Sequence, residues 1–513
     1  NQSFIFSVSS KMQPDVDSDP LELDLTEVYT IDMMLNVIKA LGNTLIGHNA
    51  GTSISTGDSN VAVGSSALQA NTTASYNTAV GDSALKANTT SSNNTAVGQF
   101  ALTANTAANN TAVGMDALLS NTTGTINTAV GRSALRSNTT GHRHTAVGYG
   151  ALYNADACED NTAVGYEALL TNTTGSYNTA VGKDSLLANT TGAENVAVGN
   201  AALYTNTTAS YNAAVGFESL LSNTTGSYNT AIGNASLRSH TTGSQNVALG
   251  SNALYSSTTG SDSVAVGHRS LFTNTTGEDN TSIGTQSLEN NTTGINNVAT
   301  GWRALQDNTT GGYNVAVGWQ CMLENTTASF NVAMGCNALR DNLTGADNTG
   351  VGREALKNNT ASNNTAFGSQ ALVTNTSGTS NTAVGFRALR DSTTSSENTA
   401  VGYDALLSNT SGQQNTAVGF GAMQSTTTGI ENTAVGHRAL HSNISASDNT
   451  AVGINALFTS TAASYNTAVG KNALLNDTSG NSNTAVGYGA MKYNTTANEN
   501  TAVGYNALGD TTT

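Results

Sequence analysis

Residues that commonly perform acid–base, nucleophilic or metal chemistry are few in this sequence, and they share no pattern. The seven histidines are His48, His142, His144, His240, His268, His437 and His441. None recurs at a fixed distance from a carboxylate or a serine, and the close pair His142 and His144 forms neither a triad nor a complete metal site. We therefore predict surface histidines, no catalytic residue, no cofactor, and a protein that is not an enzyme.

An acidic segment near the start of the chain has part of the pattern of a calcium loop. Asp15, Asp17 and Asp19 alternate as calcium ligands do. Such a loop needs glycine and then glutamate at the places where Pro20 and Thr26 stand. An acidic solvated loop fits better, so we predict no metal site.

The composition restricts the partners of the chain. Charged residues make up only 10% of the 513 residues, and the formal net charge is −16. Nucleic acid and anionic membrane attract clustered Lys and Arg, which are absent here. No run of about 18 apolar residues exists, so we expect no membrane insertion. Cys158, Cys321 and Cys336 have no metal-ligand spacing, and the sequence leaves their pairing open.

A short motif, Asn-Thr-Ala-Val-Gly, recurs along almost the whole chain. Its glycine repeats with a period of 17 from Gly64 to Gly504, with only two intervals of 16. A fixed short period indicates one structural unit copied many times, with each copy contacting chiefly its neighbours. The sequence predicts a repetitive β-solenoid, or β-roll, of about 27 coils over residues 43–513, preceded by a separate segment at 1–42. Stacked strands about 4.8 Å apart would give a rod of roughly 130 Å.

One coil shows which residues form the strand and which form the core. The polarity of Asn-Thr-Ala-Val alternates with period two, which is typical of a β-strand, and no helical spacing of apolar residues occurs in the unit. Leucines such as Leu68 and valines such as Val63 recur in fixed columns. We expect both columns to be buried. The glycine after valine allows a turn with positive φ.

The segment Asn-Thr-Thr-Gly predicts a second corner, through the turn chemistry of asparagine. Both shortened intervals lose one residue there, in the segments 105–110 and 359–364. Because loops tolerate deletions better than strands, we expect this corner to project outward.

The residue before the valine is almost always alanine, with Ser282 and Gly350 as small substitutes. In a regular strand it points away from the valine, so something must pack closely on it. That neighbour is either the opposite wall of the same coil or another chain. We favour the second, with a homotrimer as one arrangement, because an additional apolar contact would stabilise a thin coil.

The repeat resembles a known family of fibrous proteins. Asn-Thr-Ala-Val-Gly, followed two residues later by Ala-Leu, resembles the Ser-Val-Ala-Ile-Gly repeats of YadA-like trimeric autotransporter adhesin heads. It is also similar to Asn-Thr-Ala-Val-Gly repeats in tail and surface fibres of phages, large viruses and marine microbes. The segments 60–64 and 314–318 carry the resemblance best. It implies a left-handed β-roll with three chains side by side, extracellular or on a cell or virion surface. A longer corner, and the lack of a coiled-coil stalk and a C-terminal anchor, argue against bacterial autotransport.

The segment 1–42 differs from the repeats. It contains strand-like stretches at 3–8 and 21–25 and an amphipathic helical pattern at 31–41. Solenoids need their first coil covered, which favours a cap. A second interpretation is assembly: Phe4, Phe6 and Val8 of one molecule would cover the open edge of the last coil, near Gly504, of another.

Two sets of surface residues are candidates for contact or modification. Aromatic residues directly after glycine stand in successive coils as Tyr149 with Tyr166, Trp302 with Trp319, Phe386 with Tyr403 and Phe420, and Tyr488 with Tyr505. They predict stacked ladders, and also a surface that could contact cell-surface glycans or a neighbouring fibre. Asn-Thr-Thr is an N-glycosylation sequon at Asn71, Asn88, Asn121, Asn172 and Asn223. A structural turn is the alternative, because Ser257, Ser392, Thr426 and Asp477 occupy the same column.

The sequence favours a non-enzymatic extracellular structural fibre or appendage subunit, an adhesin-like rod able to assemble with itself into oligomers or end to end. A receptor-binding tail or surface fibre of a virus or phage is the alternative. Ice binding is a third interpretation, because Thr78, Thr95, Thr111 and Thr128 form a regular hydroxyl array that valines interrupt.

Overall fold

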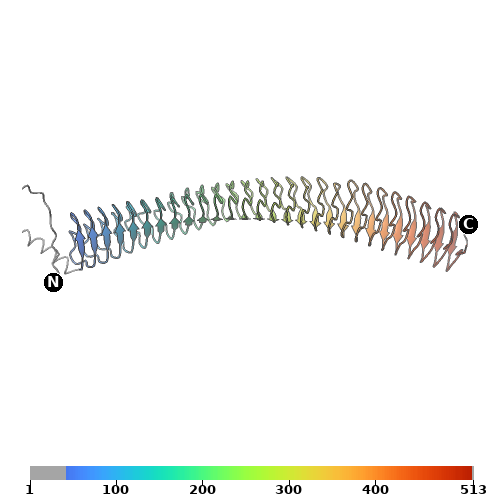
Figure 1. Ribbon diagram of the computed structural model, residues 1–513, viewed down its shortest axis with the longest axis horizontal. Helices are drawn as coiled ribbons and strands as arrows, with labels where there is room; N and C mark the ends of the chain where they lie inside the picture. Colours follow the sequence, from blue (N-terminus) through green and yellow to red (C-terminus); the bar gives the residue numbers. More distant parts are fainter. Residues whose placement is uncertain (1–41, 511–513) are drawn as a thin grey trace, which may run out of the picture.

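The computed structural model describes residues 42–510, which form one long, gently curved rod of stacked coils (Figure 1). Each coil contributes one strand of three residues. The strands are Thr44–Ile46 (β1), Val61–Val63 (β2), Thr78–Val80 (β3), Thr95–Val97 (β4), Thr111–Val113 (β5), Thr128–Val130 (β6), Thr145–Val147 (β7), Thr162–Val164 (β8), Thr179–Val181 (β9), Val196–Val198 (β10), Ala213–Val215 (β11), Thr230–Ile232 (β12), Val247–Leu249 (β13), Val264–Val266 (β14), Thr281–Ile283 (β15), Val298–Thr300 (β16), Val315–Val317 (β17), Val332–Met334 (β18), Thr349–Val351 (β19), Thr365–Phe367 (β20), Thr382–Val384 (β21), Thr399–Val401 (β22), Thr416–Val418 (β23), Thr433–Val435 (β24), Thr450–Val452 (β25), Thr467–Val469 (β26), Thr484–Val486 (β27) and Thr501–Val503 (β28).

Each strand pairs in parallel with the strand of the next coil. In β9 and β10, Thr179 lies beside Val196 and Ala180 beside Ala197. The two shortened coils keep this register, so that Thr95 still pairs with Thr111. The predicted β-solenoid is therefore confirmed, and the deleted residues belong to the loop that the sequence indicated.

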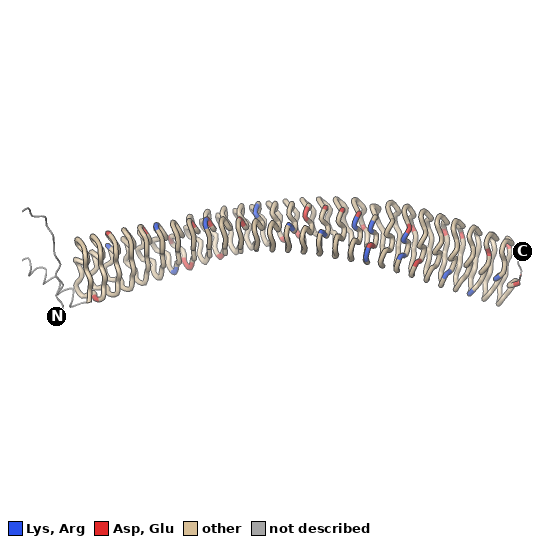
Figure 2. Tube along the Cα trace, viewed as in Figure 1, with Lys and Arg blue, Asp and Glu red and all other residues tan. Residues whose placement is uncertain are grey.

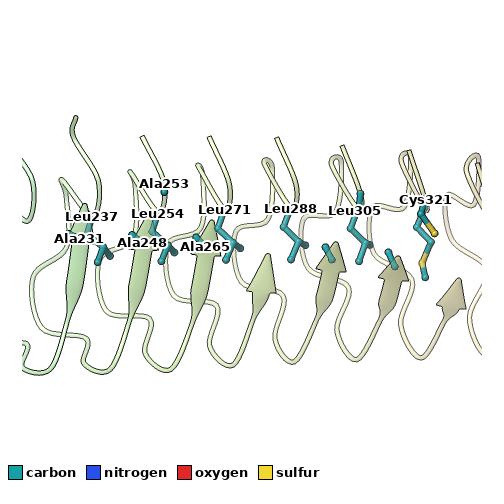
Figure 3. Packing of buried hydrophobic residues seen from close by; sticks show 14 of the residues in the cluster. Ala231, Leu237, Ala248, Ala253, Leu254, Ala265, Leu271, Leu288, Leu305 and Cys321 are labelled. Carbon is teal, nitrogen blue, oxygen red and sulfur yellow. The ribbon is translucent and has the colours of Figure 1, made fainter. Parts of the chain in front are cut away.

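The core lies between the strand of a coil and the leucine on its other side (Figure 3). We call the middle residue of each strand the strand alanine column and the leucines the core leucine column. Ala197 and Leu203 are both fully buried, and this holds along the rod except in its end coils, where Leu45 is half-buried and Leu508 is exposed. Burying a leucine side chain contributes about 1.5–3 kcal/mol, so the core leucine column is the main apolar contribution of each coil.

Our expectation for the valines is wrong. In each strand the alanine points inward, and the residues on both sides of it point outward, as in the burial pattern of Thr179–Val181. Val113 keeps 37% of its surface exposed and Ile232 keeps 45%. The leucine from the opposite wall fills the narrow coil and leaves room for little more than a methyl group.

The interpretation of the alanine column as a contact between chains is wrong for the same reason. Ala197 is fully buried within its own coil, and Gly350 at this position lies against Leu339 of the same chain. The small residues are required by the opposite wall, which was the other alternative.

The glycine after each strand is required by the next coil as well as by its own turn. Gly182 has φ of +135°, and a Cβ atom on it would lie 2.4 Å from the carbonyl oxygen of Gly199. That separation is far below van der Waals contact, so any side chain would push the coils apart.

The core leucines adopt a conformation that the sequence does not indicate. Leu203 and Leu220 have φ of 52° and 50°, in the left-handed region that glycine and asparagine usually occupy. Each such residue costs about 1–2 kcal/mol relative to ordinary backbone. The backbone of Leu220 is held by its hydrogen bond to the carbonyl of Ser236 in the next coil, at 3.0 Å.

Two buried columns of asparagine accompany the apolar core. The strand asparagine column precedes each strand: the backbone N–H of Asn77 donates to Oδ1 of Asn60 at 3.0 Å. The corner asparagine column opens each Asn-Thr-Thr corner: Nδ2 of Asn138 donates to Oδ1 of Asn121 at 2.9 Å and to the carbonyl of Gly141 at 3.2 Å. Burying a polar group without a hydrogen bond is costly, and these columns supply many of the partners from coil to coil, although Oδ1 of several corner asparagines, such as Asn223, has none.

We predict that Ala197→Leu destabilises the rod much more than Val198→Leu. The first variant overpacks the core beside Leu203, at a cost of about 1–3 kcal/mol in the free energy of unfolding. The second places a leucine on the outside, where Leu249 already stands naturally. Urea denaturation, with hydrogen exchange of the neighbouring coils, measures both. A larger loss for Val198→Leu would contradict the observed orientation of the strand.

Candidate functional site

The outward residues of the strands form a continuous face along the rod. We define the outer face as the first and third residue of each of the 28 strands. These positions hold Thr, Val, Ile, Leu, Met, Phe and Ala and no charged residue, from Thr44–Ile46 to Thr501–Val503. Lys, Arg, Asp and Glu are scattered over other parts of the coils (Figure 2). The outer face is therefore a continuous apolar and hydroxyl-bearing surface along the rod, made of residues that are partly to well exposed.

The aromatic ladders that the sequence predicts are confirmed. Tyr149 and Tyr166 stack with ring centroids 5.3 Å apart, and Trp302 and Trp319 with centroids 5.5 Å apart. The same stacking joins Phe386 to Tyr403, Tyr403 to Phe420, and Tyr488 to Tyr505. Phe420 also stacks on His437, which extends its ladder by one ring.

Further ladders occur in columns that the sequence analysis did not consider. Tyr211 stacks on Tyr228, and Tyr313 on Phe330, in the column before the strand asparagine. These aromatic residues are also one repeat period apart in the sequence, and that spacing predicts stacking in any column of the coil.

Cations lie over several of these rings. The guanidinium of Arg303 lies 4.4 Å from the centroid of Trp302, and that of Arg387 lies 5.0 Å from the centroid of Phe386. Arg387 also forms an ion pair with Asp404 at 2.6 Å. Trp319 nevertheless remains 46% exposed, so the ladders both join coils and present aromatic surface to solvent.

The sequon asparagines are inside the coil. Asn71, Asn88, Asn121, Asn172 and Asn223 are all fully buried. The side-chain nitrogen of Asn223, where a glycan would be attached, donates to Oδ1 of Asn206 and to the carbonyl of Gly226, each at 2.9 Å. A glycan on these nitrogens is incompatible with the folded coil, and the structural turn accounts for the sequence.

The coil that contains Cys158 departs most from the repeat, and its changes compensate one another. Ala155 replaces a corner asparagine, and Cys158 stands where neighbouring coils have Gly141 and Gly175. The side-chain nitrogen of Asn172, which would otherwise donate to a corner asparagine in this coil, donates to Sγ of Cys158 at 3.6 Å. Burial raises the pKa of the Cys158 thiol to about 12, which leaves it unreactive.

Two of the histidines that we expected at the surface are buried. His144 stands in the strand asparagine column, and its Nδ1 accepts from the backbone N–H of Asn161 at 3.2 Å, as an asparagine oxygen would. His240 stands in the corner column, with Nε2 2.7 Å from the carbonyl of Gly243. Burial lowers the pKa of both, to about 4 for His144, so that both rings are neutral at physiological pH. Both rings therefore take the place of an asparagine side chain in their columns.

The described residues include three cysteines and no cluster placed to bind a metal ion. Cys158, Cys321 and Cys336 are all free thiols. Between residues 42 and 510, no three His, Cys, Asp or Glu side chains are placed to share a metal ion. The same stretch contains no helix long and apolar enough to cross a membrane.

The expectations for the segment 1–41 lie outside the described part of the chain. They include the cap over 1–42, the acidic loop at Asp15, Asp17 and Asp19, and end-to-end assembly through Phe4, Phe6 and Val8. End-to-end assembly stays a prediction.

Comparison with known proteins finds no match for this chain among family models, curated proteins or solved structures.

We predict that Asp477→Asn stabilises the rod above neutral pH. Asp477 is a buried carboxylate in the corner column; Oδ1 accepts from the N–H of Gly480 at 2.8 Å, and Oδ2 has no partner. Burial raises its pKa to about 7, so the folded chain holds a proton that the unfolded chain has released. Its contribution to stability is complete below about pH 4, the ordinary pKa of aspartate, and is lost as the pH rises to about 7.

The advantage of Asp477→Asn should therefore grow between about pH 4 and 7 and then stay constant, at on the order of 1–3 kcal/mol. Urea denaturation at a series of pH values measures it. Asp448→Asn, which removes an exposed carboxylate, is the matched control and should show no such rise. Parallel pH profiles for the two variants would contradict the burial of a protonated Asp477.

Proposed function

We propose that this protein is a non-enzymatic structural rod, a spacer or appendage subunit that works outside the cell or on a virion. The observation that supports it is the uninterrupted stack from β1 to β28, in which every strand pairs only with its neighbours in sequence. Such a chain sets a distance: about 27 spacings of about 4.8 Å give roughly 130 Å. The resemblance of the repeat to those of surface fibres supports the extracellular placement.

Images of native particles test this proposal. Negative-stain electron microscopy of the intact source should show rods of roughly 130 Å, or fibres built from them, projecting from a surface. Rods on virions would favour the receptor-binding or surface-fibre alternative. A protein found dispersed inside the cell would contradict the proposal.

The outer face supports assembly with other copies of the same chain. The outer face is roughly 130 Å long, and each strand of three residues extends about 10 Å across it, which gives about 1,300 Å² per chain. This exceeds the roughly 800 Å² per partner of a standard interface. A second copy has the same coil spacing, so its side chains can interdigitate along the whole length, which a partner with another period cannot do. We propose a homo-oligomer that buries the outer face, and a trimer is one arrangement.

Charge placed on the outer face should therefore separate the chains. Val164→Lys with Val198→Lys puts two charges two coils apart on this face, where a partner would desolvate them. Asn200→Lys with Asn234→Lys adds the same charge, two coils apart, in an exposed column that already contains Lys183. Light scattering should give a multiple of 52.1 kDa for the wild type and for the control pair, and a monomer for the valine pair. A monomeric wild type at micromolar concentration would contradict assembly.

Ice binding is a second candidate function, and one observation favours it. The threonines that the sequence placed in a single column are accompanied by an outward valine column, so the exposed array is two residues wide and free of charge. Val61, Val196, Val247 and Val264 interrupt the hydroxyls but keep the methyl groups. A thermal-hysteresis assay of the purified chain tests this function. A difference between the melting and freezing temperatures would support it, and no difference would rule it out.

A further inference from the structure

A depression of about 280 Å³ opens on the surface of the rod beside the Tyr149–Tyr166 ladder. We propose that it binds one neutral hexose unit of a polysaccharide. This site goes beyond the function proposed above, because a rod can serve as a spacer whether or not it holds a sugar.

The depression exists because one side chain is missing from a column. Gly150 occupies the position that Ser133 holds in the preceding coil and Glu167 in the following coil. Its φ of +62° matches the 59° of Ser133 and the 52° of Glu167, so the backbone course is unchanged. Because Gly150 has no side chain, the three coils leave a space between them that opens to solvent.

The walls combine aromatic and polar groups. Tyr149, Tyr153 and Leu170 supply apolar surface, and Ser133, Asn154 and Glu167 supply polar groups. The side chains of Ser133 and Asn154 make no hydrogen bond within the described chain, so they are available to a ligand. Tyr153 is held in place by Arg136, which donates to its hydroxyl at 2.9 Å.

A sugar ring matches this arrangement. A hexose has a C–H face that packs on an aromatic ring, and hydroxyl groups around its edge that donate to carboxylates and amides and accept from hydroxyls and amides. Small-molecule sites are typically apolar with a few well-placed polar groups, in volumes from about 300 Å³ upward. The volume here lies just below that range, which suits a ligand as small as one sugar unit. Glu167 is the one charged residue that lines the depression, so its carboxylate disfavours an acidic sugar in direct contact with it. Arg132, Arg136 and Lys183 lie over the neighbouring rings and do not line the depression.

The polymer is favoured over the free sugar by the neighbouring ladder. Tyr166 stacks on Tyr149 with nearly parallel rings and is 48% exposed. A saccharide chain that leaves the depression along the rod would meet this second aromatic surface.

Gly150→Ser tests the site with little disturbance of the fold. A Cβ on Gly150 would meet Cγ of Glu167 and Cδ1 of Leu170 at 3.5 Å, which is ordinary contact, so the new side chain fits and occupies part of the depression. Gly421→Ser is the matched control: it lies in the same column, with φ of +58°, in a coil far along the chain. The circular dichroism spectra of the two variants, and their free energies of unfolding in urea, should be the same.

The probes are the methyl glycosides of glucose, galactose and mannose and their linear oligosaccharides, titrated into the full chain and followed by saturation-transfer NMR. We expect at least one hexose to bind, and its oligosaccharide to bind more tightly. Gly150→Ser and Tyr149→Ala should each weaken binding at least about tenfold, which corresponds to about 1.4 kcal/mol. Gly421→Ser should bind as the wild type does.

Binding to none of these probes, or equal binding by wild type and Gly150→Ser, would overturn the proposal. Methyl glycosides of sialic acid and glucuronic acid are titrated in the same way, and preferred binding of either would overturn the assignment to neutral sugars. The rod shape and the mass of the assembly are measured separately, so failure of the sugar site leaves the spacer proposal standing.

Discussion

The hydrogen-bonded contact between one coil and the next is the interaction on which the whole rod depends. Each strand pairs in register with the following strand, and the backbone of the corners is bonded to adjacent coils in the same way. At this spacing every side chain lies directly over its counterpart in the adjacent coil. In the buried columns a residue type that stacks well on its own kind is therefore repeated, which explains the recurrence of glycine, alanine, leucine and asparagine.

Each column meets this demand through a different physical effect. Glycine after the strand leaves room for the carbonyl of the next coil. Leucine fills the coil, and asparagine passes a hydrogen bond from one coil to the next. Where another residue interrupts a column, its effect is compensated. Cys158 compensates for Ala155 in the same coil, and His240 supplies donors and acceptors equivalent to those of asparagine.

Much of this architecture could be predicted from the sequence, because the period, the strand and the turn glycines are local patterns. The aromatic ladders followed from the same period. The direction of the strand residues could not be predicted: in Thr-Ala-Val, hydrophobicity favours valine inside, whereas the narrow space opposite Leu203 admits only alanine. The left-handed backbone of the leucines and the burial of Asn223 also arise from contacts between coils, which one coil read alone does not show. The depression at Gly150 depends on three coils together.

X-ray diffraction from oriented rods tests the stacking of coils most directly. If the strands lie across the rod and stack along it, a strong reflection at about 4.8 Å must appear along the rod axis. A strong reflection at that spacing perpendicular to the axis would mean that the strands run along the rod. Such a pattern, or one at the helical pitch of about 5.4 Å, would contradict the stacked coil.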